Sequence, residues 1–219
     1  MIHSKVFESA NKALFEQNLL QKLKESEDFS EKRVIRSPRA VGDIAQDIIG
    51  EEAINCFPRG LIADYNDKFA RRAMADVAFT DIDSNYFVVD IKTHNKTTDF
   101  NMPNITSVER LARFYEDDTN FFAILFIEYA IEDGKLNFIK VSINPIEYFK
   151  WSCLTIGALG WGQIQIANAN NIDIEVSARK KWMLELCDVL DIFYPKEISK
   201  IGKRLTRFKA VREFWEQKT

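Results

Sequence analysis

The sequence of 219 residues is poor in histidine and cysteine, with two of the first and three of the second. Because zinc sites in proteins draw on these side chains, the presence of only His3 and His94 argues against a histidine-based zinc site. Cys56, Cys153 and Cys187 are odd in number and lie among apolar neighbours. We therefore expect reduced core cysteines in a cytoplasmic protein.

Long apolar runs are also missing. No segment approaches the ~20 apolar residues that cross a bilayer, and the longest candidate, residues 121–131, is shorter and contains Glu128. The first residues lack the apolar core of a secretory signal. The glycine-punctuated residues 157–166 lack the lysine and the following helix of a phosphate-binding loop. These absences predict a protein without a membrane partner or an organic cofactor.

The chain has no excess of positive charge, because its formal net charge is −3. Nucleic-acid binding usually shows as a basic excess, so composition alone does not indicate it. The distribution is uneven, however, since residues 196–218 form a basic segment. A localised basic surface can bind phosphates even in a mildly acidic protein.

Length and apolar periodicity predict one α/β domain that spans residues 1–219. The predicted elements are helices over residues 8–26, 40–56, 105–115 and 178–194, strands over 121–130, 136–143 and 163–166, a loop or short helix over 59–69, and a loop over 93–104. The helix within residues 1–35 suits plain packing or a dimer contact. Pro195 predicts a break, after which residues 195–219 form a separate basic helix.

Residues 74–95 hold the most informative pattern in the chain. Two apolar runs flank a polar connection over residues 80–85, which predicts a β-hairpin. If the hairpin is symmetric about Asp83, the numbers of paired residues sum to 166, and Asp76 lies opposite Asp90. Because side chains alternate along a strand, Lys92 shares that face.

Charges in these positions call for a partner. Facing carboxylates of Asp76 and Asp90, with Cβ atoms roughly 5 Å apart, repel one another. A divalent cation held by oxygen ligands, such as Mg²⁺, relieves this repulsion. Two acids and a lysine that converge beside a metal ion are typical of phosphodiester cleavage.

The predicted helix over residues 40–56 carries an acidic edge. Asp43, Asp47 and Glu51 recur every four residues. This spacing fits a solvated helix face. It also fits a helix that leads into the sheet and from which one of these three acids points into the metal site.

The spacing of Asp76 from Asp90-Ile91-Lys92 resembles the signature of the PD-(D/E)XK nuclease superfamily, with Ala75 where that signature has proline. The resemblance extends to the residues that follow. Residues 90–95, then 102–107, and later 163–166 resemble, in the same order, segments of type II restriction endonucleases in this superfamily.

This resemblance implies a restriction-endonuclease-like fold, a mixed β-sheet flanked by helices. It implies a homodimer that cuts double-stranded DNA at a short palindromic site with Mg²⁺, leaving blunt ends. Asp76, Asp90 and the carbonyl of Ile91 would hold the metal, and Lys92 would orient or activate the attacking water and stabilise charge on the phosphate. Asp43 or a neighbour would be the accessory acid that relatives carry on the early helix. The expected DNA-contacting residues are Thr93, His94, Asn95, Asn101, Asn104 and Gln163.

Two rival interpretations remain open at this point. The first is a nuclease of the same fold that acts in repair, on junctions or without sequence preference. The second is a catalytically inactive DNA-binding domain in which Asp76, Asp90 and Lys92 form a buried ion network. Leaving a pair of aspartates without a metal ion would be costly in this last case.

Overall fold

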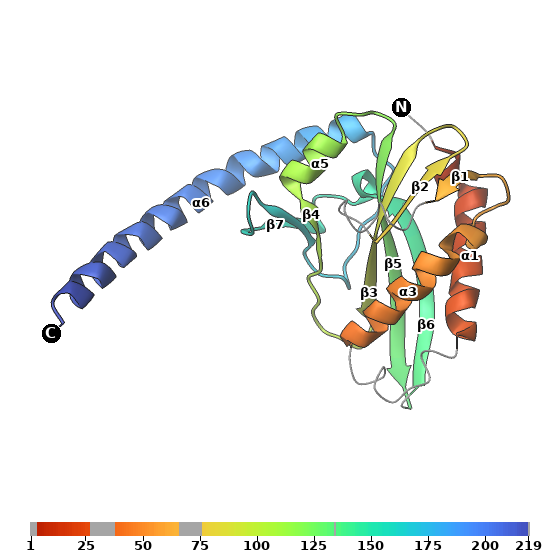
Figure 1. Ribbon diagram of the computed structural model, residues 1–219, viewed down its shortest axis with the longest axis horizontal. Helices are drawn as coiled ribbons and strands as arrows, with labels where there is room; N and C mark the ends of the chain where they lie inside the picture. The colour runs from red at the N-terminus through yellow and green to blue at the C-terminus, as the bar shows by residue number, and fades with distance from the viewer. Residues whose placement is uncertain (1–3, 27–37, 66–75, 134, 219) are drawn as a thin grey trace. The chain divides into compact units, whose positions relative to one another are not determined.

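The computed structural model describes residues 4–26, 38–65, 76–133 and 135–218 (Figure 1). The chain divides into two compact units, Met1–Val176 and Ser177–Thr219. The first unit contains the two sheets and the shorter helices. The second consists of a long helix and is described separately below.

The main sheet of the first unit is mixed. Its strands are β1 (Ile62–Tyr65), β2 (Val77–Asp81), β3 (Tyr86–Asn95), β5 (Asn120–Glu132) and β6 (Lys135–Pro145). They lie in the order β1-β2-β3-β5-β6, with β3 and β5 parallel and the other neighbours antiparallel. Strands β3 and β5 lie inside the sheet, and most of their residues are buried.

Two helices cover one face of this sheet. Helix α1 (Ser9–Glu25) packs against β6, and α3 (Pro38–Cys56) crosses β3 (Figure 1). Each presents an apolar stripe at helical spacing to the sheet. The stripe of α3 consists of Val41, Ala45, Ile49 and Ala53, each at most 4% exposed. A mixed sheet flanked by helices confirms the α/β prediction.

A smaller sheet carries Asn104 and Gln163, two residues that the sequence predicts to contact DNA. It contains β4 (Asn104–Ser107), β7 (Leu154–Gly157) and β8 (Gln163–Ile166), in the order β4-β8-β7. Helix α5 (Val108–Phe114) follows β4 directly. Two short 3-10 turns, η1 (Lys5–Phe7) and η3 (Ile146–Tyr148), complete the unit.

Several predicted boundaries are wrong. Ile62–Tyr65 is a strand within residues predicted as a loop or short helix, and Asn104–Ser107 is a strand where the prediction has a loop and a helix start. Strand β3 continues to Asn95, into the predicted loop. Both missed strands are only four residues long, so their apolar alternation is too brief to recognise, and pairing with β2 and β8 holds them.

The second unit corrects the predicted break at Pro195. Helix α6 runs without interruption from Arg179 to Glu216. Proline lacks an N–H, so the helix forgoes one internal bond at this position at a cost of ~3 kcal/mol. More than a dozen helical residues on each side continue the helix regardless. Among the described residues, no helix has the length and apolarity that crossing a bilayer demands.

Candidate active site

The β2–β3 hairpin has the predicted register. The paired residues run from Val77 with Val89 to Thr80 with Tyr86, and each pair sums to 166. Ser84 takes a left-handed conformation (φ 64°) in the turn. This register brings Asp76, which directly precedes β2, to the level of Asp90 on β3. Met74 and Ala75, which the prediction included in the first strand, lie outside the described residues.

Asp76 is fixed by two hydrogen bonds to β3. Its backbone N–H donates to the carbonyl of Val89 at 3.1 Å. Its carboxylate Oδ2 accepts the backbone N–H of Ile91 at 2.7 Å. The second bond ties the carboxylate of Asp76 to the backbone of β3, the strand that carries Asp90 and Lys92. The three side chains are therefore held close to one another.

Asp90 is a buried carboxylate with only half of its bonding capacity used. The residue is 6% exposed. Its Oδ1 accepts from Lys92 Nζ at 2.8 Å, whereas its Oδ2 is buried without a hydrogen-bond partner among the described residues. Burial raises the pKa of Asp90 to about 7, and the nearby charge of Asp76 adds to this against the opposing effect of Lys92.

A second buried aspartate in the same hairpin shows the contrast. Asp81 is 1% exposed, and its carboxylate accepts hydrogen bonds from Ser4 Oγ, from the backbone N–H of Asp83, and from the backbone and side chain of Asn85. Those donors explain why Asp81 is buried, because it closes the turn and ties down the N-terminus. Asp90 has no such structural explanation.

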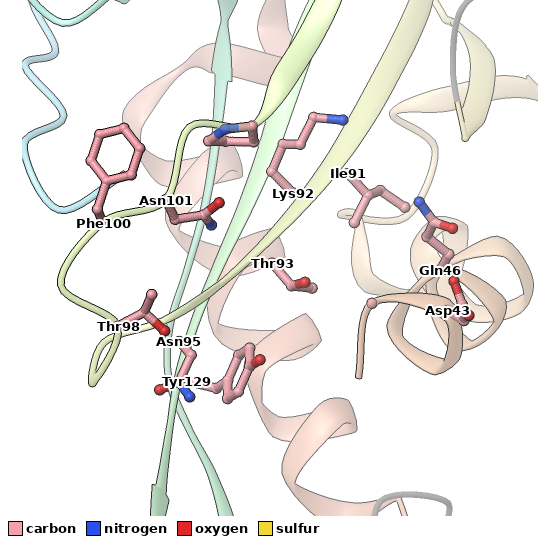
Figure 2. Close-up of a pocket in the computed structure, with 12 residues that line it drawn as sticks. Asp43, Gln46, Ile91, Lys92, Thr93, Asn95, Thr98, Phe100, Asn101 and Tyr129 are labelled. Carbon is pink, nitrogen blue, oxygen red and sulfur yellow. The ribbon is translucent and has the colours of Figure 1, made fainter. Parts of the chain in front are cut away.

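Lys92 borders a pocket of about 460 Å³. Figure 2 shows it on β3 between α3, which carries Asp43 and Gln46, and the loop that carries Phe100 and Asn101. The lining combines amides, hydroxyls, a carboxylate and an ammonium group: Gly42, Asp43, Gln46, Ile91, Lys92, Thr93, Asn95, Thr98, Phe100, Asn101, Pro103 and Tyr129. Apolar side chains such as Ile91, Phe100 and Pro103 share this wall with the polar groups, so the pocket offers charged and hydrogen-bonding groups on a mixed surface.

The acid expected on the second helix lies at this pocket. Asp43 is exposed and faces the pocket from the first half of α3. A Cβ built on Gly42 would lie 3.3 Å from Thr93 Oγ1, so helix and strand approach closely at this point. Asp47 is exposed and does not line the pocket, and the side chain of Glu51 lies outside the described residues. Asp43 is therefore the member of the acidic edge positioned to assist.

The donor set fits a hard divalent cation. In the described part of the chain, no three acidic, histidine or cysteine side chains cluster closely enough to form a preformed metal site. The available donors are the carboxylates of Asp76 and Asp90, with the Ile91 backbone between them. Mg²⁺ takes one or two carboxylates and otherwise water or phosphate oxygens, and the unpaired Asp90 Oδ2 offers it an open acceptor.

The structure gives His94 a different place from the expected one. The residue is 0% exposed, so it has no surface to offer DNA in this conformation. Its Nε2 lies 2.9 Å from Asn170 Oδ1, and the amide nitrogen of Asn101 lies 3.4 Å from its Nδ1. An amide nitrogen only donates, so Nδ1 accepts and Nε2 donates.

Asn170, which pairs with His94, also holds the loop that follows β3. Its side-chain nitrogen donates to the carbonyls of Thr98 and Asp99, at 2.8 and 3.2 Å. Farther along the loop, the N–H of Ala169 donates to the carbonyl of Asn101 at 2.7 Å. The loop after β3 is therefore fastened to a segment some seventy residues away in sequence, a role that sequence patterns do not reveal.

The remaining expected DNA contacts divide between two places. Thr93, Asn95 and Asn101 line the pocket of Lys92. Asn104 and Gln163 instead lie on the smaller sheet, where Asn104 Oδ1 accepts from the side chain of Gln165.

Gln163 borders a second pocket, of about 420 Å³, which sequence reasoning missed. Arg110 and Trp161 line it as well, and Trp161 is 70% exposed. Trp161 sits in a tight turn between Gly160 (φ 56°) and Gly162 (φ 113°), whose conformations favour glycine. The glycine spacing in the sequence was the available signal, since it indicates a turn that can display a side chain.

Comparison with models of known protein families finds no match for this chain, and a search of curated proteins finds no significant relative.

Proposed function

We propose that the protein is a Mg²⁺-dependent endonuclease that hydrolyses double-stranded DNA, with the fold and site of a type II restriction endonuclease. One observation carries the proposal. Asp90 is buried with Oδ2 unpaired among the described residues and Oδ1 on Lys92, its carboxylate feels the charge of Asp76, and Lys92 lines the pocket. Burying a carboxylate in this way is costly, and a fold retains such a cost where a ligand relieves it.

Each side chain has a defined part in this reaction. Asp76 and Asp90 bind the cation through oxygen. A Mg²⁺ ion held there would supply positive charge for the phosphate and a coordinated water. Lys92, held by Asp90 at 2.8 Å, places a positive charge beside the pocket where negative charge grows on the phosphate oxygens. Water adds to phosphorus, an ester P–O bond breaks, and the leaving oxygen takes up a proton.

The DNA would contact two polar surfaces near this site. Thr93, Asn95 and Asn101 present hydroxyl and amide groups that suit sugar–phosphate oxygens and base edges. Asn104 and Gln163 present further amides on the smaller sheet. Because a single site cuts one strand, cleavage of a palindromic duplex calls for two copies related by two-fold symmetry. We therefore include the homodimer and the short palindromic target in the proposal.

Incubation with supercoiled plasmid tests the proposal directly. The full chain with Mg²⁺ should give a small set of discrete linear fragments, and EDTA should leave the plasmid intact. A smear would instead support a nuclease without sequence preference. Intact plasmid in Mg²⁺ and in Mn²⁺, over a panel of DNAs of different sequence, would overturn the proposal and favour the inactive DNA-binding domain.

Two conservative variants give the test a control. Asp90→Asn keeps the size and an acceptor for Lys92 but removes the charge, so cleavage should disappear. Asp83→Asn changes an exposed acid in the turn of the same hairpin, whose carboxylate pairs with Lys5 at 3.0 Å, and cleavage should persist. Equal loss in both variants would show that the hairpin, rather than the carboxylate, is what matters.

A further inference from the structure

Helix α6 exposes a long row of apolar side chains. Six of them recur at intervals of three, four or seven residues, and their exposed fractions lie between 36% and 69%. They are Tyr194, Ile198, Ile201, Leu205, Phe208 and Trp215, and we call them the α6 stripe. Exposed apolar rows of this length are rare on a free surface and usually mark an interface.

The spacing of the α6 stripe is that of a coiled-coil seam. Intervals of four and three alternate from Tyr194 to Phe208, and Trp215 follows one heptad later. Arg212 occupies the one remaining seam position. A period of 3.5 residues keeps such side chains facing a partner helix. The stripe covers about 32 Å of helix, at 1.5 Å per residue.

The opposite face of α6 is basic. Lys196, Lys200, Lys203 and Arg207 recur at intervals of four, three and four, and all are exposed. This face is suited to water or phosphates, whereas the α6 stripe is not. The α6 stripe and the basic face therefore suit different partners on the two sides of one helix.

The size of the α6 stripe fits one particular occupant. Six side chains of this kind with these exposures present on the order of 800 Å², which is what one partner contributes to a standard-size interface. We propose that the stripe pairs with the same stripe of a second copy of this chain, as an antiparallel coiled coil.

Charges beside the α6 stripe select the antiparallel orientation. Glu197 and Arg204 lie on the same flank, seven residues apart. In the antiparallel register that places Ile198 opposite Ile201 and Tyr194 opposite Leu205 of the second copy, Glu197 meets Arg204 of the partner subunit twice by symmetry, and the ends of the stripe face the N-terminal half of the partner's α6. In a parallel pair Arg204 would face Lys209 of the partner subunit, and like charges would meet twice.

The inference rests on α6 and is independent of the nuclease chemistry, although it supplies a contact for the homodimer in the proposed function. Sedimentation equilibrium of the full chain at low micromolar concentration tests it without DNA or metal. The wild-type chain should sediment as a dimer. Leu205→Lys, which places a charge in the middle of the α6 stripe, should raise the dimer dissociation constant at least a hundredfold with unchanged helix content. Ala210→Lys adds the same charge on the opposite face and should leave the dimer intact.

A milder substitution tests the orientation and does not disturb the apolar seam. Arg204→Glu should weaken an antiparallel dimer, and adding Glu197→Arg should restore it. Tighter association of the single variant would show a parallel pair and overturn the orientation. A wild-type monomer would overturn the inference itself. A lower melting temperature for Leu205→Lys would then show that the α6 stripe packs on its own chain. Binding of the wild-type chain to vesicles of anionic lipid would show that the stripe contacts a membrane surface instead.

Discussion

Lys92 Nζ lies 2.8 Å from Asp90 Oδ1, while Oδ2 of the same carboxylate is buried without a hydrogen-bond partner among the described residues. The ammonium group therefore satisfies only half of the acid. Asp76 lies close enough for its charge to raise the pKa of Asp90, so the pair of acids resists full ionisation. A cation bound between them would relieve both the repulsion and the unpaired oxygen.

The raised pKa of Asp90 predicts how the metal-free protein responds to pH. The pKa rises from the usual 3.8 to about 7, so between these values the folded chain binds a proton that the unfolded chain has lost. The contribution of Asp90 to the free energy of unfolding is therefore most favourable below pH 4. It falls by up to roughly 4 kcal/mol as the pH rises toward 7. Asp90→Asn should remove this loss.

Thermal melting in EDTA at pH 5 and pH 8 measures the effect. The melting temperature of Asp90→Asn should exceed that of the wild type at pH 8 and approach it at pH 5. Asp83→Asn, which changes an exposed acid, should follow the wild type at both values. A variant less stable than the wild type at pH 8 would show that Asp90 contributes to folding in its ionised form.

Asp76→Asn separates metal binding from folding. The amide oxygen can still accept the Ile91 N–H, so the bond that anchors residue 76 at 2.7 Å is kept. Losing one of two charged oxygen donors should weaken Mg²⁺ or Mn²⁺ binding roughly a hundredfold. Removal of the charge should also lower the pKa of Asp90, because Asp76 contributes to its rise.

Calorimetric titration with Mn²⁺ gives the affinity, and melting in EDTA gives the fold. Unchanged melting with much weaker binding is expected. Unchanged binding would remove Asp76 from the set of ligands, and a large drop in melting temperature would give it a structural role instead.

Lys92→Met should stop chemistry more than binding. The variant keeps the apolar stem and removes the charge beside the phosphate, and loss of such a group typically costs 10²–10⁴-fold in rate. DNA affinity should fall less than fivefold, because Lys92 would be one phosphate contact among several and already pairs with Asp90. Lys96→Met is the matched control, since Lys96 lies just beyond the same strand and pairs with Glu128 at 3.2 Å.

Single-turnover cleavage and a filter-binding assay in Ca²⁺ measure the two quantities separately. Equal losses of rate and affinity would make Lys92 a binding residue. Similar losses of rate in the Lys96 variant would point to general electrostatics rather than to a catalytic position.

The sequence predicted the hairpin well because its evidence is local. Alternating apolar residues, a polar turn and the charges of Asp76, Asp90 and Lys92 all lie within 17 residues, and one register satisfies them. His94 shows the limit of such reasoning. Its role depends on Asn170, 76 residues away, and a lone imidazole in a polar stretch gives no sign of that partner.

The smaller sheet and the long helix show the same limit. Strand β4 is only four residues long and depends on pairing with β8, so its own sequence is typical of a loop. The glycines beside Trp161 indicated a turn but not what the turn displays. Pro195 predicted a break because a proline interrupts helices on average, whereas the helix continues for more than a dozen residues on each side of it.

Trp161→Ala tests whether the second pocket contributes to DNA binding. The indole is 70% exposed beside Arg110 and Gln163, and an aromatic ring next to a cation suits an unstacked base. Stacking of this kind contributes about 1–3 kcal/mol per base, so DNA affinity should fall roughly 5- to 150-fold. Mn²⁺ binding should not change, because Trp161 borders a different pocket from Lys92.

Fluorescence anisotropy with duplex and single-stranded DNA, in Ca²⁺ and at two salt concentrations, measures the loss. Ile139→Ala is the control, since Ile139 is a 45% exposed apolar residue on β6. Affinity in the tryptophan variant should keep the wild-type salt dependence, because stacking releases no counterions. A changed salt slope would instead assign the lost affinity to phosphate contacts of Arg110, and unchanged affinity would exclude this pocket from the DNA surface.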